Sequence, residues 1–336
     1  MCTVLFMKTE AGFLLGKNND NFFSEGILFT NRRGIIKSAL IMPPCNPLQW
    51  KVKYGSLSFS QCGKELPVGG MNEAGLVVEQ TTLPDTKYPE YRGGAGVGEL
   101  QSIQYLLDTC VDVQEAIRYI ENTEICQPTW PIHYVIADAS GNMAVIEYIQ
   151  RERKIFTGKN IAAKVVTNSR YDKANALYLQ NNSDIRCENE YEYNSLQRFY
   201  KAADILNSTE YFDISSAFMY LEQLERIDTV WNIIYDPQNL NIYFRTKDSV
   251  EIKNVNLREI DFGEKSQPLL FPLSYPIEGN INCKFMKYSR EKNSELINKF
   301  LKNELVASVM GITIPDELLE YLASYPELME EANQYH

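Results

Sequence analysis

The chain has 336 residues, of which 44% are apolar, so it can bury the core of one large domain. Its formal net charge is −11 and its isoelectric point is near 4.9. An acidic surface argues against nucleic acid or an anionic membrane as a main partner, because both attract basic proteins. The opening residues 1–17 lack the charged and apolar pattern of a secretory leader, so none is expected, and no run approaches the roughly 18 apolar residues that would span a bilayer.

The first half of the chain predicts strands and then helices. Residues 3–9 and 12–17 predict two strands joined by a tight turn, so that GKNND (16–20) lies at the end of the second strand. Residues 98–121 carry apolar side chains at helical spacing in two segments that divide near Val111 and Asp112. Further strands are expected at residues 26–34 and 76–83.

The second half predicts a strand meander, three helices and a hairpin, and this order indicates an α+β layered domain. We expect a domain of residues 2–280 and a helical C-terminal extension of residues 281–336. The extension begins with a basic helix, Lys284–Lys302, and residues 303–336 contain acids but no Lys or Arg. These helices could pack on each other, pack on a partner subunit or form a solvated appendage. The expected elements are strands within 132–149, 154–158 and 162–169, helices at about 170–181, 192–206 and 214–225, and a hairpin at 229–246.

Cysteine and histidine usage limits the possible chemistry. The seven cysteines are odd in number and no two form a C-x-x-C pair, so we expect reduced thiols, no disulfide framework and a cytoplasmic protein. With only two histidines, His133 and His336, a multi-histidine metal site is nearly excluded, and no metal or cofactor is expected. His133 lies in an alternating strand and is expected to be a core histidine. The glycines of GGAGVG (93–98) predict a flexible loop, because the Gly-Lys-Ser/Thr ending of a phosphate loop is absent.

Cys2 is a candidate nucleophile. Cysteine is small enough to permit removal of Met1, which would leave a thiol and a free α-amine on one carbon. A free thiol titrates at about 8.5 and an α-amine at about 7.7–8.0, so the amine could accept the thiol's proton without any histidine. Lys17 could favour the thiolate as a nearby cation, and Asp20 could orient the α-ammonium. From the residues alone, an incidental strand cysteine stays the alternative.

Acyl transfer also needs hydrogen-bond donors for an oxyanion. Asn168, at the end of a predicted strand, could donate through its side-chain amide, although a turn-forming asparagine is the alternative. Asn72 and Thr82 flank the strand at 76–83 and are further candidates.

Seven collinear motifs resemble the choloylglycine hydrolase and penicillin V acylase family of N-terminal nucleophile hydrolases, also described as linear amide C–N hydrolases. They are MCT (1–3), GKNND (16–20), GGMNEAGLVVE (69–79), IHYVIADASGNMAVIEY (132–148), VVTNS (165–169), NSLQRF (194–199) and TVWNIIYD (229–236). The resemblance implies a four-layer αββα sandwich. It also implies that Cys2 is the nucleophile, its own amine the base, and Asp20 the residue that orients the amine.

The same resemblance assigns further roles. Asn168 would donate to the oxyanion and Arg198 would be the second basic residue of the site. Lys17 stands where the family has arginine, which keeps the charge but loses the planar fork of donors. Thr82 falls where bile-salt hydrolases have asparagine, and it could still donate its backbone N–H.

We therefore expect a hydrolase that cleaves an unbranched amide between an acyl group and a small amine, through a thioester on Cys2. Its partners would be a small-molecule N-acyl substrate and further copies of the chain in a dimer or tetramer, with no nucleic acid and no membrane. Three alternatives stay open. One is an N-terminal-cysteine dipeptidase, which would need an acidic cluster to hold a substrate amine. Another is acyl transfer of the isopenicillin N type, and the third is a non-catalytic binding or assembly module that retains Met1.

Overall fold

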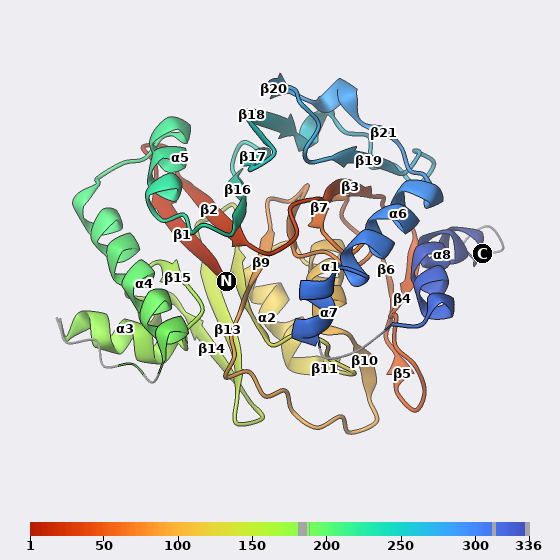
Figure 1. The fold of residues 1–336 in the computed structure, drawn as a ribbon, viewed down its shortest axis with the longest axis horizontal. Helices are drawn as coiled ribbons and strands as arrows, with labels where there is room; N and C mark the ends of the chain where they lie inside the picture. Colours follow the sequence, from red (N-terminus) through yellow and green to blue (C-terminus); the bar gives the residue numbers. More distant parts are fainter. Residues whose placement is uncertain (181–186, 188, 311–313, 333–336) are drawn as a thin grey trace.

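The computed structural model describes residues 1–180, 187, 189–310 and 314–332, and it contains two large β-sheets packed face to face (Figure 1). In the first sheet the strand order is β15-β1-β2-β16-β17-β18-β20, and the pairs are antiparallel except for β18 with β20. Its strands are β1 (Cys2–Lys8), β2 (Phe13–Asp20), β15 (Val165–Val166), β16 (Thr229–Asp236), β17 (Asn241–Thr246), β18 (Ser249–Asn256) and β20 (Gly279–Asn280).

The second sheet has the order β14-β13-β12-β9-β8-β7-β3-β19-β21, and all of its pairs are antiparallel. Its strands are β3 (Ile27–Asn31), β7 (Ser56–Ser60), β8 (Gly69–Asn72), β9 (Val77–Thr82), β12 (Ile132–Ala137), β13 (Met143–Ile149), β14 (Glu152–Thr157), β19 (Leu269–Pro272) and β21 (Met286–Lys287). Short strands form two small additional sheets: β4 (Ile36–Ser38) with β6 (Gln49–Lys51), and β5 (Asn46–Pro47), β10 (Ala95–Val97) and β11 (Glu124–Ile125).

Helices cover the outer face of each sheet, so the layers are ordered αββα (Figure 1). The second sheet carries α1 (Glu99–Thr109) and α2 (Val113–Asn122), and the first carries α3 (Tyr171–Leu179), α4 (Glu190–Ser208) and α5 (Ile214–Gln223). The chain ends in α6 (Arg290–Leu301), α7 (Glu304–Met310) and α8 (Asp316–Ala332). This arrangement confirms the expected α+β sandwich. The expected division of 98–121 is also confirmed, because the Asp112 carboxylate caps α2 by accepting from the Glu115 N–H.

Successive residues of β9 serve different layers. Val77 packs with Leu57 and Phe59 in the core between the two sheets, whereas Val78 packs with Leu106 in the core under α1. The alternation follows from the two-residue period of a strand. Because both faces of the second sheet are covered, the run LVVE can be apolar at consecutive positions.

The C-terminal helices lie against the body of the molecule. Ile297 of α6 packs with Leu319 and Ala323 of α8, so the two helices contact each other. The hydroxyl of Tyr325 on α8 donates to the carbonyl of Ser38, which belongs to β4. The helical character expected for this segment is confirmed from α6 onward, and these helices pack on each other and on the body. The basic helix expected from Lys284 begins only at Arg290, because Met286 and Lys287 form β21 and pair with β19.

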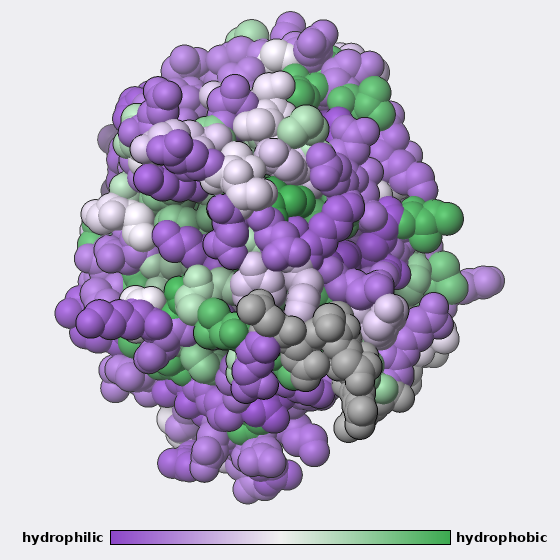
Figure 2. Space-filling model, turned by 90° about the vertical axis from the view of Figure 1, so that its left-hand side faces the viewer, coloured by the Kyte–Doolittle hydropathy of each residue, from purple (hydrophilic) through white to green (hydrophobic). Residues whose placement is uncertain are grey.

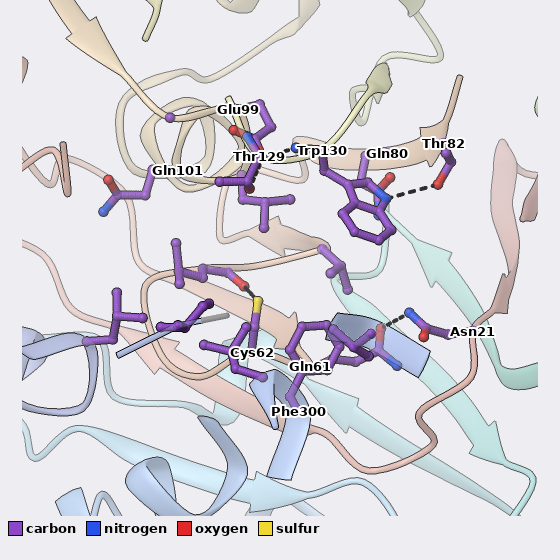
Figure 3. A pocket seen from close by; sticks show the side chains of 18 of the residues that line it. Asn21, Gln61, Cys62, Gln80, Thr82, Glu99, Gln101, Thr129, Trp130 and Phe300 are labelled. Atoms are coloured by element: carbon purple, nitrogen blue, oxygen red, sulfur yellow. Dashed lines mark hydrogen bonds between the residues drawn. The ribbon is translucent and has the colours of Figure 1, made fainter. Parts of the chain in front are cut away.

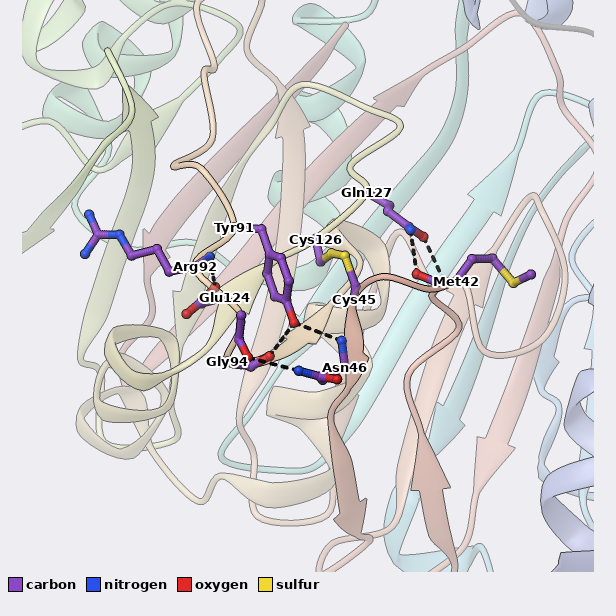
Figure 4. The surroundings of a disulfide bond; sticks show 10 residues. Met42, Cys45, Asn46, Tyr91, Arg92, Gly94, Glu124, Cys126 and Gln127 are labelled. Atoms are coloured by element: carbon purple, nitrogen blue, oxygen red, sulfur yellow. Dashed lines mark hydrogen bonds between the residues drawn. A yellow bond between two sulfur atoms is a disulfide. The ribbon is translucent and has the colours of Figure 1, made fainter.

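A disulfide joins Cys45, which precedes β5, to Cys126, which follows β11 (Figure 4). Beside it, the side-chain amide of Gln127 accepts from the N–H of Met42 at 2.8 Å and donates to its carbonyl at 2.7 Å. The expectation that all cysteines are reduced thiols is therefore wrong for this pair. The sequence could not indicate the pairing, because the two residues meet only through the path of the folded chain. With one pair of cysteines oxidised, cysteine usage no longer indicates a cytoplasmic compartment.

Hydrophilic residues predominate on the face shown in Figure 2, and apolar side chains are scattered among them. Within the described ranges, no helix has both the length and the apolar character needed to cross a membrane.

Candidate active site

Cys2 begins β1 and lines a cavity of about 590 Å³. The residue is buried, with 4% of its surface exposed, and it lines the cavity together with Asn19 and Asp20 of β2. The β1–β2 hairpin places Cys2 opposite Asn19, one residue from Asp20. The second strand thus extends three residues beyond the predicted 12–17, and GKNND lies inside it.

The backbone nitrogen of Cys2 donates to the Oδ1 atom of Asn168 at 2.9 Å. This nitrogen is a peptide N–H in the chain that begins at Met1, and it is the same atom that becomes the α-amine once Met1 is removed. The amine of Met1 itself donates to the backbone carbonyl of Asp20 at 3.2 Å. A preformed acceptor therefore already holds the nitrogen that would act as a base.

One carboxylate oxygen of Asp20 forms a hydrogen bond, and the other does not. Its Oδ1 accepts from the hydroxyl of Thr229 at 2.6 Å, while Oδ2 has no hydrogen-bond partner among the described residues and lies 3.7 Å from Nε of Arg226. Burial raises the pKa of the Asp20 carboxyl, and the positive charges of Arg198 and the chain's α-amine oppose that rise. The positive charges next to Cys2 therefore favour the ionised form of this carboxyl against the effect of burial.

Arg198 ties the ends of β1 and β15 together. Its Nη1 donates to the carbonyl of Cys2 at 2.8 Å, and its Nη2 donates to Oδ1 of Asn168 at 2.8 Å. Ser195, on the same face of α4 three residues earlier, accepts from the backbone N–H of Asn168 at 2.8 Å. Burial lowers the pKa of Arg198, and the carboxylate of Asp20 works in the opposite direction. Ser195 and Arg198 of the NSLQRF motif thus both hold Asn168 in place.

The side-chain nitrogen of Asn168 donates to the carbonyl of Thr82 at 2.8 Å, which links the segment just after β15 of the first sheet to β9 in the second. Thr82 also accepts from the indole nitrogen of Trp130 through its hydroxyl, at 3.2 Å. The structure therefore brings Cys2, Asp20, Asn168, Arg198 and Thr82 together, and Cys2, Asp20 and Thr82 line the cavity.

Residues 50–249, more than half of the chain, match the model of the acyl-coenzyme A:6-aminopenicillanic acid acyl-transferase family. The chain belongs to this family. The matched range includes Thr82, Asn168 and Arg198. Because it starts at residue 50, it does not include Cys2 and Asp20.

A penicillin V acylase from Pectobacterium atrosepticum is 30% identical over 138 residues, a match that covers 36% of this chain and 36% of that protein. The match thus spans about a third of the relative's length. The penicillin V acylase structure from Agrobacterium tumefaciens aligns with a TM-score of 0.70 at 21% identity, covering 86% of this chain and 98% of that one. A conjugated bile acid hydrolase structure from Clostridium perfringens aligns with a TM-score of 0.66 at 17% identity, covering 83% and 98%. These matches confirm the resemblance drawn from the motifs, and the structural ones confirm the fold.

In this member of the acyl-transferase family, Lys17 lies in the interior between the sheets. Its ammonium donates to the carboxylate of Glu79 and to the carbonyl of Val68, the latter at 3.3 Å. The hydroxyl of Tyr235 donates to the other oxygen of Glu79 at 2.6 Å. In the β1–β2 ladder Lys17 faces Val4, two residues beyond Cys2. The guanidinium that contacts Cys2 belongs to Arg198, and a catalytic role for Lys17 stays a prediction.

Two other candidates have structural partners. The Asn72 side chain donates to the carbonyls of Leu107 and Cys110, at the end of α1, so it anchors a turn under that helix. His133 bonds to Glu147 through Nδ1 at 3.0 Å and lies 2.9 Å from the carbonyl of Thr167 through Nε2. The expectation that His133 is a core histidine is confirmed.

Asn19 is a site residue that the motifs did not indicate. It is 3% exposed and lines the cavity, and its Oδ1 lies 3.8 Å from the Cys2 sulfur. Its Nδ2 has no hydrogen-bond partner in the part of the chain that the structure describes. The signal was present in the hairpin: a tight turn that places Thr9 beside Gly12 also places Cys2 beside Asn19.

The cavity contains a second thiol, that of Cys62, and several polar side chains (Figure 3). Trp130 and Thr82 lie on one side of it, and Cys62, Gln61 and Phe300 lie on the opposite side. Burial raises the pKa of Cys62 to about 12, so it stays a neutral thiol near pH 7 and is a poor nucleophile. Within the described ranges, no group of three or more His, Cys, Asp or Glu is placed to hold a metal ion.

Proposed function

We propose that this chain hydrolyses a linear amide C–N bond of an N-acyl small molecule, with Cys2 of the Met1-trimmed chain as the nucleophile. One observation carries the proposal: a cysteine that lines a cavity has its backbone nitrogen held by Asn168 and its carbonyl held by Arg198. The names of the relatives, penicillin V acylase and conjugated bile acid hydrolase, describe the same reaction class.

The first half of the reaction forms a thioester. The α-amine of Cys2 takes the proton of its own thiol, the sulfur attacks the acyl carbon, and the carbonyl electron pair moves to oxygen. Collapse of this intermediate breaks the C–N bond, and the α-ammonium gives its proton to the leaving amine. In the second half, water attacks the thioester, the α-amine takes a proton from the water, and the thiol leaves with that proton as the acid is released.

Asp20 and Asn168 position the base in this mechanism. The free Oδ2 of Asp20 would accept a hydrogen bond from the α-ammonium, and Oδ1 of Asn168 already accepts from the same nitrogen at 2.9 Å. An ammonium beside Asp20 also lowers the pKa of that buried carboxyl, so each charge stabilises the other.

Two side-chain amides would hold the oxyanion. Asn168 uses one N–H of its amide group on the carbonyl of Thr82 and keeps the second, because an amide group carries two donors. Asn19 offers an amide group with neither donor engaged among the described residues, beside the Cys2 sulfur. We propose Asn19 as an oxyanion donor in addition to the predicted Asn168 and the backbone N–H near Thr82.

Acyl transfer is the second candidate, and the description of the matched family favours it. An amine acceptor would then attack the thioester in place of water. Adding a free amine to the reaction separates the two outcomes, because transfer converts the acyl group to a new amide whereas hydrolysis yields the acid.

The dipeptidase alternative requires a carboxylate that is free to hold a substrate amine. Besides Asp20, the cavity is lined by Glu99 and Asp228. Oε1 of Glu99 accepts from the backbone N–H groups of Thr129 and Trp130, and Asp228 pairs with Arg226 at 2.8 Å. One oxygen of each carboxylate is therefore already engaged, which favours an acyl substrate over a substrate held by its amine.

The experiment that tests the proposal measures amine release from glycocholate, penicillin V, N-acyl amino acids and a dipeptide, beside the Cys2→Ala variant. Intact mass on the same samples reports whether Met1 is removed. We expect release from at least one amide by the trimmed enzyme and none by the variant. A variant with more than a hundredth of wild-type activity would refute the nucleophile. Retention of Met1 with no release from any compound would support a binding module.

Location and assembly are further proposals. We propose a cytoplasmic protein that forms a dimer or tetramer, and light scattering with size-exclusion chromatography tests the assembly. The Cys45–Cys126 disulfide is the observation against a reducing compartment. Alkylation of these two cysteines in intact cells before lysis, as free thiols, would support the cytoplasm.

A further inference from the structure

We propose that α6, α7 and α8 form the acyl-binding wall of the cavity, and that the substrate carries a large apolar acyl group that reaches α8. The inference rests on the proposed function, because it names the acyl half of the amide that Cys2 would attack. The matched family model ends at residue 249, so this wall lies outside the region that defines the family.

The wall is apolar and comes from all three helices. Its apolar lining residues include Phe300 and Leu301 from α6, Val306 from α7, and Leu318, Tyr321 and Leu322 from α8. The body of the molecule supplies Met42, Leu66 and Val68 to the same cavity. A pocket lined mostly by apolar side chains, with fewer polar groups among them, suits an acyl group whose carbonyl lies at Cys2.

Exposed apolar side chains gather at this cavity. Among the described residues, Phe22 is 57% exposed, Met42 56%, and Leu318 and Tyr321 are each 39% exposed, and all four line it. Large apolar side chains that share one exposed surface indicate a surface that a ligand covers. The volume of about 590 Å³ lies within the range of roughly 300–1,000 Å³ that holds drug-sized ligands, and an acetyl group would leave most of it unfilled.

The wall is fixed to the body by buried contacts. The Oδ1 atom of Asn293 on α6, which is fully buried, accepts from the backbone N–H of Lys64 at 2.8 Å. Arg32 forms an ion pair with Glu330 of α8, and Tyr325 donates to the carbonyl of Ser38. Because both ends of the wall are anchored, its lining residues face the cavity in a defined arrangement.

Two leucines of α8 give a matched pair of variants. Leu318 is 39% exposed and lines the cavity, whereas Leu328 is 46% exposed and is not part of the lining. Truncation of either removes the same atoms from the same helix at similar exposure. Neither belongs to the buried cluster of Ile297, Leu319 and Ala323, so both variants should fold.

The experiment uses N-acetyl-, N-hexanoyl- and N-dodecanoylglycine as substrates and dodecanoate as a binding probe. We expect Leu318→Ala to lower kcat/KM for the dodecanoyl compound by about tenfold, leave the acetyl compound within twofold, and weaken dodecanoate binding by about tenfold. That tenfold loss corresponds to about 1.4 kcal/mol, which is less than the free energy gained by fully burying a leucine side chain. Leu328→Ala should behave as the wild type in every measurement.

The two readouts separate the inference from the proposed function. If the wild type hydrolyses none of the three amides but Leu318→Ala still weakens dodecanoate binding, the acyl wall stands and the hydrolysis of N-acylglycines is refuted. If Leu318→Ala and Leu328→Ala bind dodecanoate equally well, or if the wild type does not bind it at all, the acyl wall is refuted. If Leu318→Ala lowers kcat/KM equally for the acetyl and dodecanoyl substrates, the acyl wall is refuted as well.

Discussion

Replacing Asn19 by leucine tests the proposed oxyanion donor, because leucine keeps the size of the side chain and removes its amide. A hydrogen bond to a charged group is worth about 1.5–3 kcal/mol, and each 1.4 kcal/mol is a factor of ten in rate. We therefore expect Asn19→Leu to lower kcat/KM by about 10–100-fold. The value lies at or below the loss of roughly 10²–10³-fold measured for single oxyanion donors, since Asn168 would still contribute.

The same change should not lower the stability of the fold. The Nδ2 atom of Asn19 is buried without a partner among the described residues, and burying an unpaired amide is unfavourable. Replacing it by an apolar group of similar size is neutral or stabilising. Thermal melts of Asn19→Leu should therefore equal or exceed those of the wild type.

Asn18, the next residue of β2, is the matched control. Its Nδ2 donates to the carbonyl of Leu221 and its Oδ1 accepts from Asn232, both at 2.8 Å. Asn18→Leu leaves both buried partners unpaired at about 1–3 kcal/mol each, so we expect a loss of about 2–6 kcal/mol in the free energy of unfolding.

Urea melts and steady-state amine release on the two variants complete the test. The expected pattern is an active-site defect without destabilisation for Asn19→Leu and destabilisation for Asn18→Leu. An Asn19→Leu enzyme with kcat/KM within threefold of wild type would show that the reasoning about Asn19 is wrong.

Three further predictions concern residues around the site. Lys17→Met should lower the free energy of unfolding by about 3–5 kcal/mol, because it leaves the charge of Glu79 buried without its partner; chemical melts of the single and the Lys17→Met, Glu79→Gln double variant check this, and a single variant as stable as the double would contradict it. In the folded chain the pKa of Asp20 is raised above its unfolded value near 3.8. The free energy of unfolding therefore falls as the pH rises from the unfolded pKa through the folded one, because the buried carboxyl must ionise. Asp20→Asn should therefore gain thermal stability over the wild type at neutral pH, lose that gain in acid and lose activity; a gain that is the same at every pH would argue against a buried, titrating carboxyl. Serine at both Cys45 and Cys126 removes a link across 81 residues of sequence, which by the loop-entropy model costs about 4–5 kcal/mol. Urea melts should show that loss, and reductant should shift the wild type toward the variant and leave the variant unchanged.

Local pattern explains which parts of the fold were predictable. The helical spacing in 98–121 and the Asp112 cap are local, and so they indicated α1 and α2 with their division. The hairpin that carries Cys2 and Asp20 is equally local. The prediction ended its second strand at residue 17, whereas β2 continues through the polar residues to Asp20. Asn168 and Arg198 were expected from the resemblance, and their contact depends on α4 crossing the ends of β1 and β15.

Features that depend on contacts between distant segments were not predictable. Lys17 finds Glu79 in the other sheet, 62 residues away, and no spacing rule indicates that pair. The C-terminal helices looked like an appendage by charge, because the residues that face the cavity are interleaved with acids that face solvent. Only the packing of α8 against β4 and α6 reveals that Leu318 belongs to the cavity wall.

The central claim is that Cys2 carries the acyl group on a chain that has lost Met1. The most direct measurement stops the reaction with acid during turnover of an N-acyl substrate, and then maps the modified peptide by mass spectrometry. The account predicts an N-terminal peptide that starts at Cys2, carries one acyl group as a thioester, and loses it to hydroxylamine. An acyl group on any other residue, or an active enzyme that retains Met1, would contradict it.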